Sequence, residues 1–268
     1  MDESDQLRLR RIARQRLESL QRSGIQHLVR HPLSETNNIA EAVATTEPPE
    51  DSGQHPQPIP SIKSEATTES TEPGGLTLNS RKSQLEETCK TVCSCELCPE
   101  LVAHRTQTVF GVGNPEARLC FLGEAPGADE DQQGEPFVGR AGQLLDKIIE
   151  ACTLRRDDIY ILNVLKCRPP GNRNPSPVET ENCRPFFEKQ LEIIRPEFIC
   201  CLGSVAATTL LETKLSIGKL RGELHEWRWA KVLATYHPAY LLRNPNAKRD
   251  VWNDLQILLK EMGIKVKK

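Results

Sequence analysis

The feature that most constrains the fold of this chain is an alternation of short apolar runs with longer helix-periodic segments beyond residue 81. Short apolar runs bounded by Gly, Pro or Asn are typical of buried strands, and longer periodic segments are typical of helices. The pattern predicts strands at residues 118–122, 159–164, 197–202 and 231–235. It predicts helices at residues 142–152, 177–194, 204–212 and 250–262. Because strands and helices alternate, we expect an α/β fold of three layers, with a central, mostly parallel four-stranded sheet flanked by helices.

Composition confines this folded domain to residues 81–268. All 12 aromatic residues and all 10 cysteines lie there, and none lies in residues 1–80. The first 80 residues carry 8 basic and 12 acidic side chains (net charge −4), which leaves 27 basic and 25 acidic side chains (net charge +2) beyond them. Residues 45–75 contain six prolines and no aromatic residue, so they cannot bury enough apolar surface to offset the entropy lost on ordering. We predict a largely disordered N-terminal extension over residues 1–80, with a flexible linker at residues 45–80.

The start of the chain has a pattern of its own. Residues 7–28 combine a loosely helix-periodic apolar stripe with a basic opposite face, which predicts a short amphipathic helix. Such a helix is either simply solvated, or it docks residues 1–30 on a protein partner or a phosphate backbone. Asp2, Glu3 and Asp5 oppose a transit peptide, and the chain contains neither a run of 18 apolar residues nor a signal-peptide stretch. We expect a cytoplasmic monomer, in the bacterial cytoplasm or nucleoid, without a signal peptide or membrane contact.

Glycine-rich and polar loops follow the predicted strands, and ligands of parallel sheets bind beyond the carboxyl ends of the strands. The first strand is followed by GEAPGADED, whose glycines let backbone N–H groups approach a ligand closely. The lysine and Ser/Thr of a P-loop are missing from it, and its carboxylates would repel phosphate. The loop therefore suits a neutral polar ligand, or else is only a tight turn that leaves the sheet.

Three further residues are expected near the same edge of the sheet. Phe137, in GEPFVGRAG, is either a core residue or a platform on which a planar ring stacks. Asn163 ends the second strand, where its amide caps a turn or else donates and accepts at once, as the N–H and C=O edge of a pyrimidine requires. His237 follows the fourth strand, and Pro238 stiffens its backbone. The first loop, Asn163 and His237 thus share one edge, which indicates a binding site.

The cysteines separate into groups. In a chain without an export signal, thiols favour a metal or cluster over disulfides. Cys95-x2-Cys98 and Cys167-x15-Cys183 form a four-thiolate set, whose spacing suits tetrahedral zinc and an iron–sulfur cluster equally. Cys89 and Cys93 leave other pairings open. The remaining cysteines fall within a predicted helix or predicted strands, and we expect them to be buried: Cys120, Cys152, Cys200 and Cys201.

Five motifs in unbroken order, GEAPGADED, GEPFVGRAG, NVLKCRPPGNRNP, the later Cys183 and HPAYLLR, resemble those of the family 4 uracil-DNA glycosylases. These enzymes are the iron–sulfur branch of the uracil-DNA glycosylase superfamily. The resemblance covers residues 88–262 and implies one α/β domain that flips uracil out of single- or double-stranded DNA and hydrolyses its N-glycosidic bond, leaving an abasic site for base excision repair. It also implies a 4Fe-4S cluster, with zinc as the alternative, and its ligands fall on Cys95, Cys98, Cys167 and Cys183.

The resemblance also implies a uracil pocket. The family's pocket positions fall on Glu124, Ala125, Pro126, Phe137, Asn163 and His237. Stacking on Phe137 would be indifferent to which base is bound, so selectivity would come from Asn163, because one amide orientation pairs with uracil and leaves buried groups unsatisfied with cytosine. His237 would donate a hydrogen bond to the departing uracil anion.

A water-positioning residue is less evident. Several branches of the superfamily carry Asp or Asn where this chain has Ala125, and an alanine cannot polarise water. We nominate Glu130 and Asn172 as water-positioning or pocket-ordering catalytic residues.

Contacts with DNA are expected around the pocket. Leu241 or Leu242 would fill the space that a flipped nucleotide vacates, with Arg243 near the phosphates. Since the net charge of −2 does not by itself favour DNA, a local basic rim is required. Its expected members are Arg140, Lys166, Arg168, Arg173, Arg243, Lys248 and Arg249.

Two other functions compete with this one. A non-catalytic thiolate-cluster module that binds nucleic acid and is attached to replication or repair machinery would not need Phe137, Asn163 and His237 on one edge. A zinc-dependent deaminase is excluded because no H-x-E motif precedes the Cys-x-x-Cys.

Overall fold

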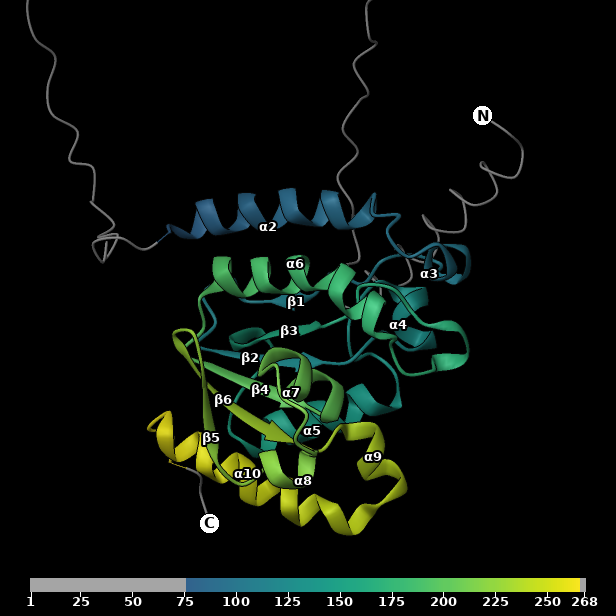
Figure 1. The fold of residues 1–268 in the computed structure, drawn as a ribbon. Helices are drawn as coiled ribbons and strands as arrows, with labels where there is room; N and C mark the ends of the chain where they lie inside the picture. Colours follow the sequence, from purple (N-terminus) through teal and green to yellow (C-terminus); the bar gives the residue numbers. More distant parts are fainter. Residues whose placement is uncertain (1–75, 266–268) are drawn as a thin grey trace, which may run out of the picture. The chain divides into compact units, whose positions relative to one another are not determined.

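The structure, a computed structural model, describes residues 76–265 (Figure 1). The predicted basic helix at residues 7–28, the docking segment at residues 1–30 and nearly all of the predicted linker lie outside the described residues. The first described helix, α2 (Leu78–Cys93), includes residues 78–80, which the sequence assigned to the linker. The Thr77 hydroxyl caps this helix by accepting a hydrogen bond from the Ser80 N–H at 3.2 Å.

Four parallel strands form the centre of the sheet, and they are the four that the sequence predicts. They are β2 (Leu119–Gly123), β3 (Tyr160–Asn163), β4 (Phe198–Leu202) and β6 (Ala230–Thr235). All residues of β2, β3 and β4 are buried, as a parallel sheet covered on both faces requires.

Two antiparallel edge strands extend the sheet to six, in the order β1-β3-β2-β4-β6-β5, so the predicted number of four is wrong. The edge strands are β1 (Val112–Gly113) and β5 (Leu224–Trp227). The first has only two residues, and the second has no buried residue. Neither therefore has the apolar run by which an inner strand is predicted from sequence.

Helices cover both faces of the sheet, which confirms the three-layer α/β architecture (Figure 1). On one face, α6 (Pro177–Ile194), α7 (Ser204–Leu210) and α8 (Ile217–Leu220) share a core with the sheet, and α2 packs on α6. On the other face, α5 (Arg140–Ala151) and α10 (Lys248–Glu261) do the same. The predicted helices match α5, α6, α7 and α10. The four core cysteines, Cys120, Cys152, Cys200 and Cys201, are buried as expected.

Short helices that the sequence did not predict occupy the loops. They are α3 (Pro99–His104), α4 (Ala128–Gln133), α9 (Pro238–Arg243), η1 (Arg156–Asp158), η2 (Pro170–Asn172) and η3 (Pro245–Ala247). Each has six residues or fewer, too few to show a helical period. The segments after β2, β3 and β6 leave from the carboxyl edge of the sheet, so α4, the β3–α6 connection and α9 surround that edge. Within residues 76–265, no helix is long and apolar enough to cross a membrane.

Candidate active site at the carboxyl edge of the sheet

Gly123 allows two side chains to meet at the end of β2. It is in register with Asn163 of β3. A Cβ built on Gly123 would lie 2.6 Å from Phe137 Cζ and closer still to Asn163 Oδ1. No other residue type fits there without displacing one of the two side chains. The glycine, the amide and the ring thus form one compact group, and Phe137 and Asn163 are brought together as predicted.

Phe137 is held in an uncommon backbone conformation. Its φ is 55°, a left-handed value that is rare for an aromatic residue and costs roughly 1–3 kcal/mol. Gly142, at the start of α5, makes the conformation sterically accessible, because a Cβ there would lie 2.9 Å from Phe137 Cα and closer still to its carbonyl. The ring is 5% exposed and belongs to the core beneath the sheet edge. Both roles considered for Phe137, core residue and platform at the site, are therefore compatible with its position.

Asn163 carries an unsatisfied acceptor into this site. Its side chain is 2% exposed, and its Oδ1 has no hydrogen-bond partner among the described residues. A buried polar atom without a partner costs about 1–3 kcal/mol, and such atoms are uncommon in folded proteins. The interpretation of Asn163 as a turn-capping residue would satisfy this oxygen within the chain. Its lack of a partner instead suits an acceptor for a ligand N–H.

His237 approaches the same space from the other side. Its ring centroid lies 5.5 Å from that of Phe137. It is the N-cap of α9, and its Nδ1 accepts a hydrogen bond from the Ala239 N–H at 3.1 Å. Nδ1 therefore carries no proton, and Nε2 of the neutral ring carries it. Burial, aided by the charge of Arg243, lowers the pKa of His237 to about 4. The imidazole is thus a neutral donor through Nε2.

The GEAPG loop closes the site over β2. Its backbone is tied to the segment after β3, because the Leu165 N–H donates to the Glu124 carbonyl at 3.0 Å. Pro126 is buried, while Glu124 and Ala125 are partly exposed. Burial raises the pKa of the Glu124 carboxyl above its ordinary value. The predicted pocket residues after β2 thus lie beside Asn163, because β2 pairs with β3 and because the loops after these two strands are hydrogen-bonded to each other.

Glu130 joins the two loops around the pocket. Its Oε2 accepts a hydrogen bond from the Gly127 N–H at 3.1 Å, and its Oε1 accepts from the N–H groups of Val138 (3.0 Å) and Gly139 (2.9 Å). Both carboxylate oxygens are therefore occupied by the protein. This geometry suits the ordering of the loop that carries Phe137 rather than the positioning of water.

Asn172 has a different environment from that expected of a catalytic residue. It is exposed, its Oδ1 accepts from Arg168 Nε at 2.8 Å, and η2 packs against α3. No described contact joins it to Phe137 or His237. The structure therefore does not place Asn172 with the pocket residues, because the turn at Gly171 (φ 63°) carries it outward.

The two leucines of α9 have opposite environments. Leu241 is 1% exposed and packs in the core with α5 and α10, whereas Leu242 is 40% exposed. The prediction that Leu241 is the wedge is therefore wrong, because the packing of one side of α9 on the core turns this side chain inward. Leu242 is still available for that role.

The predicted basic rim is only partly available. Lys166 is 1% exposed, so its assignment to the rim is wrong. Arg173 forms ion pairs with Glu179 and Glu100, and Arg168 is bonded to Asn172. The exposed members that form no ion pair with described residues are Arg140, Arg243, Lys248 and Arg249. They lie at the starts of α5 and α10 and the end of α9.

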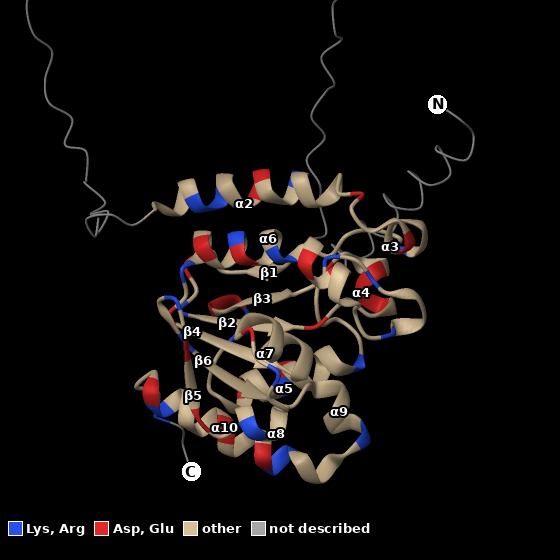
Figure 2. Ribbon diagram, in the orientation of Figure 1, with Lys and Arg blue, Asp and Glu red and all other residues tan. Residues whose placement is uncertain are grey.

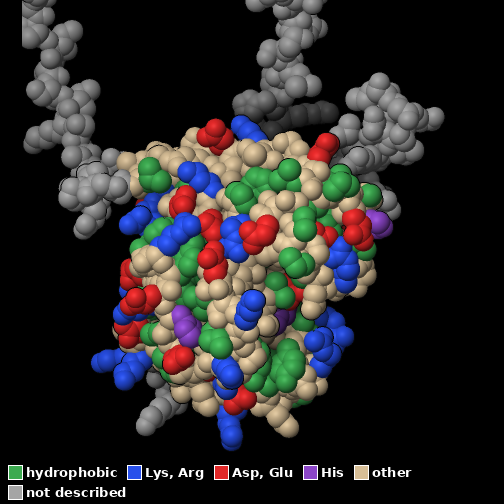
Figure 3. Space-filling model, in the orientation of Figure 1, with side chains coloured by type: hydrophobic (Ala, Val, Ile, Leu, Met, Phe, Trp, Pro, Cys, Tyr) green, Lys and Arg blue, Asp and Glu red, His purple; other side chains and the backbone are tan. Residues whose placement is uncertain are grey.

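Figure 2 shows basic residues at α9 and acidic residues on α4. On the face seen in Figure 3, both charges are interspersed.

The four predicted ligand cysteines come together from three segments of the chain. Cys98, Cys167 and Cys183 share a small buried cluster with Leu101 and Leu165. Arg105 links the fourth, since its Nη2 donates to the Cys95 carbonyl and its Nη1 to the Cys167 sulfur, both at 3.0 Å.

Further donors surround these sulfurs. Asn182 Nδ2 lies 3.4 Å from the Cys98 sulfur, and the Lys166 N–H donates to the Cys183 sulfur. Such donors stabilise metal-bound thiolates. None of these three donors, Arg105, Asn182 and the Lys166 N–H, was predicted from the sequence. Arg105 and Cys167 are 62 positions apart, so no local pattern connects them.

The four thiols are the described groups that could serve as ligands of a metal ion or a cluster. Within residues 76–265, no group of three or more His, Cys, Asp or Glu side chains is arranged to hold one metal ion. A zinc ion, with sulfurs at about 2.3 Å, would need a tight tetrahedron of thiolates. A cluster of several irons is larger and accepts ligands that are farther apart, and the hydrogen-bond donors above fit its sulfurs.

Cys89 and Cys93 form a separate pair. They lie one turn apart on α2, with their thiols in hydrogen-bonding contact. The Cys93 sulfur also contacts Thr108 Oγ1 at 3.4 Å. Burial raises the pKa of Cys89 to about 11. Neither sulfur belongs to the buried cluster around Cys167, so the alternative pairings left open by the spacing are not those that the fold brings together.

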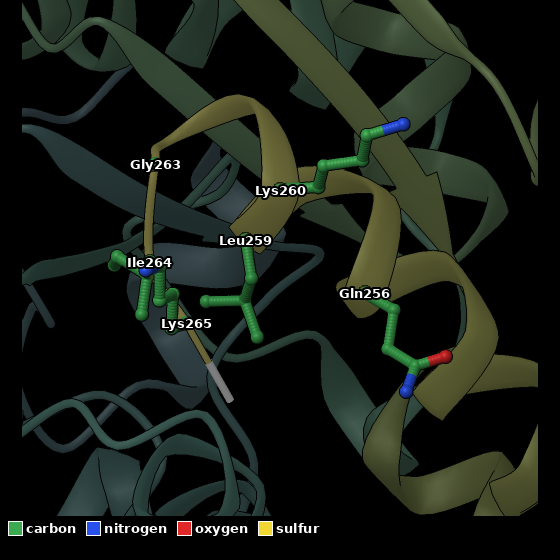
Figure 4. Close-up of a pocket in the computed structure, with 6 residues that line it drawn as sticks. All are labelled: Gln256, Leu259, Lys260, Gly263, Ile264 and Lys265. Atoms are coloured by element: carbon green, nitrogen blue, oxygen red, sulfur yellow. The ribbon is translucent and has the colours of Figure 1, made fainter. Parts of the chain in front are cut away.

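A pocket elsewhere lies far from this site. It lies at the end of α10 and is lined by Gln256, Leu259, Lys260, Gly263, Ile264 and Lys265 (Figure 4). Glu261, in the same turn, pairs with Lys231 at the start of β6. The pocket therefore lies by the amino ends of the strands, where parallel sheets do not bind their ligands.

The sequence of this chain is similar to those of known proteins. The model of the uracil DNA glycosylase superfamily matches residues 110–256. A type-4 uracil-DNA glycosylase of Archaeoglobus fulgidus is 44% identical over 180 residues, which are 64% of this chain and 90% of the relative. The type-4 enzyme of Thermotoga maritima is 44% identical over 180 residues (66% and 93%). That of Sulfurisphaera tokodaii is 40% identical over 193 residues (69% and 87%).

Proposed function

This chain belongs to the uracil DNA glycosylase superfamily, and from that premise we propose that it hydrolyses the N-glycosidic bond of uracil in DNA. The products are free uracil and an abasic site, the first step of base excision repair. The observation that carries the proposal is the buried, unpartnered Oδ1 of Asn163 beside Phe137.

Asn163 supplies base recognition. Its Oδ1 accepts the N3–H of uracil, and its Nδ2 is then free to donate to O4. Cytosine presents an amino group and a bare N3, so the same amide orientation leaves two buried groups unpaired, and such a site discriminates strongly. Stacking on the Phe137 ring contributes roughly 1–3 kcal/mol for any base. Affinity thus comes from the ring and selectivity from the amide.

His237 assists departure of the base. Since Nδ1 accepts a hydrogen bond from the Ala239 N–H, Nε2–H is the available donor. It donates a hydrogen bond to uracil O2 and so stabilises the negative charge there. Negative charge grows on O2 as the glycosidic bond breaks, and a fixed donor at a developing oxyanion is usually a large catalytic contribution. Water then adds to the sugar. Glu130 contributes by holding both loops in place, because its oxygens are already bonded.

DNA is held at the same edge. A base stacked in a duplex must be flipped out to enter the site, at a cost of a few kcal/mol. The exposed Leu242 lies five residues beyond His237 and fills the vacated space. Arg140, Arg243, Lys248 and Arg249 contact the phosphates.

The cofactor that best fits the four thiols is a 4Fe-4S cluster, held by Cys95, Cys98, Cys167 and Cys183. Such a cluster can carry electrons, but hydrolysis needs none, and its role here would be to join three segments of the chain. Zinc, the alternative, would need the four sulfurs in a tight tetrahedron around one ion. The alternative of a non-catalytic binding module is not supported, since type-4 glycosylases match most of the folded domain.

Uracil excision tests the proposal. The protein is incubated without magnesium with an oligonucleotide that contains one uracil, and alkali-labile cleavage is measured. We expect cleavage by the wild type and a loss of at least about 100-fold for Asn163→Asp, because a carboxylate cannot donate to O4. The exposed Asn253→Asp on α10 is the matched control and should keep full activity. A wild type that leaves uracil DNA intact would overturn the assignment.

A further inference from the structure

Lys166 is a buried lysine without an acidic partner. Its side chain is 1% exposed. Its Nζ donates to the backbone carbonyls of Asn163 at 2.8 Å and of Phe110 at 3.1 Å. Among the described residues, no carboxylate forms an ion pair with it. Burial of an ammonium without a counter-ion is costly, and the two carbonyl acceptors offset part of that cost.

The main chain of Lys166 contacts the thiolate set. Its N–H approaches the Cys183 sulfur, and Cys167 follows it directly. Its carbonyl accepts from the Val109 N–H at 2.8 Å. One residue therefore touches a predicted cluster ligand with its backbone and the base-reading Asn163 with its side chain. With a cluster bound, Cys167 and Cys183 would be thiolates and would carry the negative charge that the ammonium otherwise lacks.

Helix α6 strengthens the same connection. Gln190 of α6 is fully buried, and its Nε2 donates to the Phe110 carbonyl at 3.0 Å. Cys183 lies on the same helix. The Phe110 carbonyl thus accepts from both Lys166 and Gln190. The segment between the sulfurs and the end of β3 is consequently held by buried hydrogen bonds, and such networks rigidify the chain that they join.

We propose that Lys166 is a positioning residue that holds Asn163 in its uracil-reading orientation and couples it to the cysteine-bound cluster. This inference rests on the proposed function of Asn163. Without Nζ, the carbonyl at the end of β3 loses its buried donor, and the turn from residue 163 to residue 166 is free to relax. The side chain of Asn163 would then no longer be fixed opposite N3–H and O4. A misplacement of about 1 Å is enough to cost on the order of 100-fold in rate.

Lys166→Met tests the coupling, with Lys147→Met, an exposed lysine on α5, as the matched control. Single-turnover and steady-state excision are measured on holoprotein whose visible absorbance shows that the cluster is loaded. We expect Lys166→Met to lower kcat by about 10- to 100-fold with little change in KM, because phosphate contacts dominate DNA affinity. Lys166→Arg, which keeps donors in place, should recover part of the loss. A loaded Lys166→Met with the kcat of the control would overturn the proposal.

A measurement on the wild type covers the case in which Lys166→Met does not fold. Free uracil is added to the holoprotein, and the visible circular dichroism of the cluster is recorded. We expect a saturable change, because occupancy of Asn163 is passed through Lys166 to the Cys183 sulfur, and we expect no change with Asn163→Ala. An unchanged spectrum at saturating uracil would contradict the coupling. Failure of the proposed function is distinct, because the wild type would then not excise uracil at all.

Discussion

Gly123 shows how the smallest residue determines the shape of the pocket. Its missing side chain is the space in which Phe137 and the Asn163 amide meet. The strain of Phe137, with φ at 55°, is tolerated because neighbouring glycines leave room for the backbone. Backbone strain of this kind is concentrated at functional sites.

Gly123→Ala should therefore disable the site without unfolding the domain. We expect kcat/KM for uracil excision to fall at least about 100-fold, because the new methyl group displaces either the ring or the amide. Gly218→Ala on α8 is the matched control, since a Cβ there meets nothing within 4 Å. Single-turnover excision and thermal unfolding are measured for both. Equal activity of the two variants would show that Asn163 and Phe137 do not read the base together.

His237 should act as a neutral donor across the physiological range. With a pKa of about 4, against an ordinary value of about 6.5, the wild-type single-turnover rate should show no inflection between pH 5 and 8. His237→Ala should lose about 100- to 1,000-fold in rate with little loss in DNA affinity. An inflection near pH 6.5 that is abolished in the variant would contradict a neutral imidazole.

The lowered pKa of His237 also predicts how the stability of the fold depends on pH. Between pH 6.5 and 4, the unfolded chain binds a proton at residue 237 that the native state does not bind. The free energy of unfolding should therefore fall as pH is lowered through that window. His237→Gln should remove this contribution, so its melting temperature should decline less steeply with acid than that of the wild type.

Helix α9 separates two functions on adjacent residues. It has six residues, begins at the rigid His-Pro step and packs on α5. Its inward side chain, Leu241, belongs to the core, while Leu242 faces solvent at the edge of the site. Two adjacent leucines that look equivalent in sequence are therefore expected to have different mutant phenotypes.

Leu241→Ala and Leu242→Ala form a matched pair. We expect Leu241→Ala to lower the free energy of unfolding by about 2–5 kcal/mol, because it leaves a cavity. Leu242→Ala should keep its stability and lose excision from duplex DNA more than from single strands, because only the duplex must be opened. Denaturant unfolding and excision from both substrates are compared. A Leu242→Ala enzyme that is equally impaired on both substrates would exclude the wedge.

Charge over the domain as a whole is close to balanced, and its placement matters more than its sum. At the starts of α5 and α10 and the end of α9 lie the exposed members of the predicted rim that form no ion pair with described residues: Arg140, Arg243, Lys248 and Arg249. Other exposed lysines, such as Lys260, lie elsewhere on the domain. Most of the other arginines are paired with acidic residues, as in Arg118–Glu197 and Arg221–Asp254. DNA is therefore expected to bind over a limited surface.

The salt dependence of DNA binding measures how many phosphates this surface contacts. The logarithm of duplex affinity should fall linearly with the logarithm of salt concentration, with a slope of about −0.9 for each phosphate neutralised. Arg243→Ala should reduce the slope by about one such unit. Lys260→Ala, at the far end of α10, should leave it unchanged. Binding that does not respond to salt would exclude the proposed rim.

The sequence by itself determined the inner sheet and the edge at which the candidate pocket residues meet. The four apolar runs are buried on both faces, so each strand is encoded locally, and parallel order then brings Gly123, Asn163 and His237 to one edge. Family motifs supplied the four ligand cysteines. The edge strands β1 and β5 were not predictable, because they are short or half-exposed and form only against a neighbouring strand.

Only the tertiary structure decided the direction of individual side chains. Lys166 and Leu241 lie in polar or loop-like surroundings in the sequence, yet both are buried, because segments distant along the chain pack over them. Asn172, in contrast, is turned outward by the bend at Gly171. The donors to the sulfurs come from Arg105, Asn182 and the Lys166 backbone. Such contacts depend on packing between remote segments, and local periodicity carries no information about them.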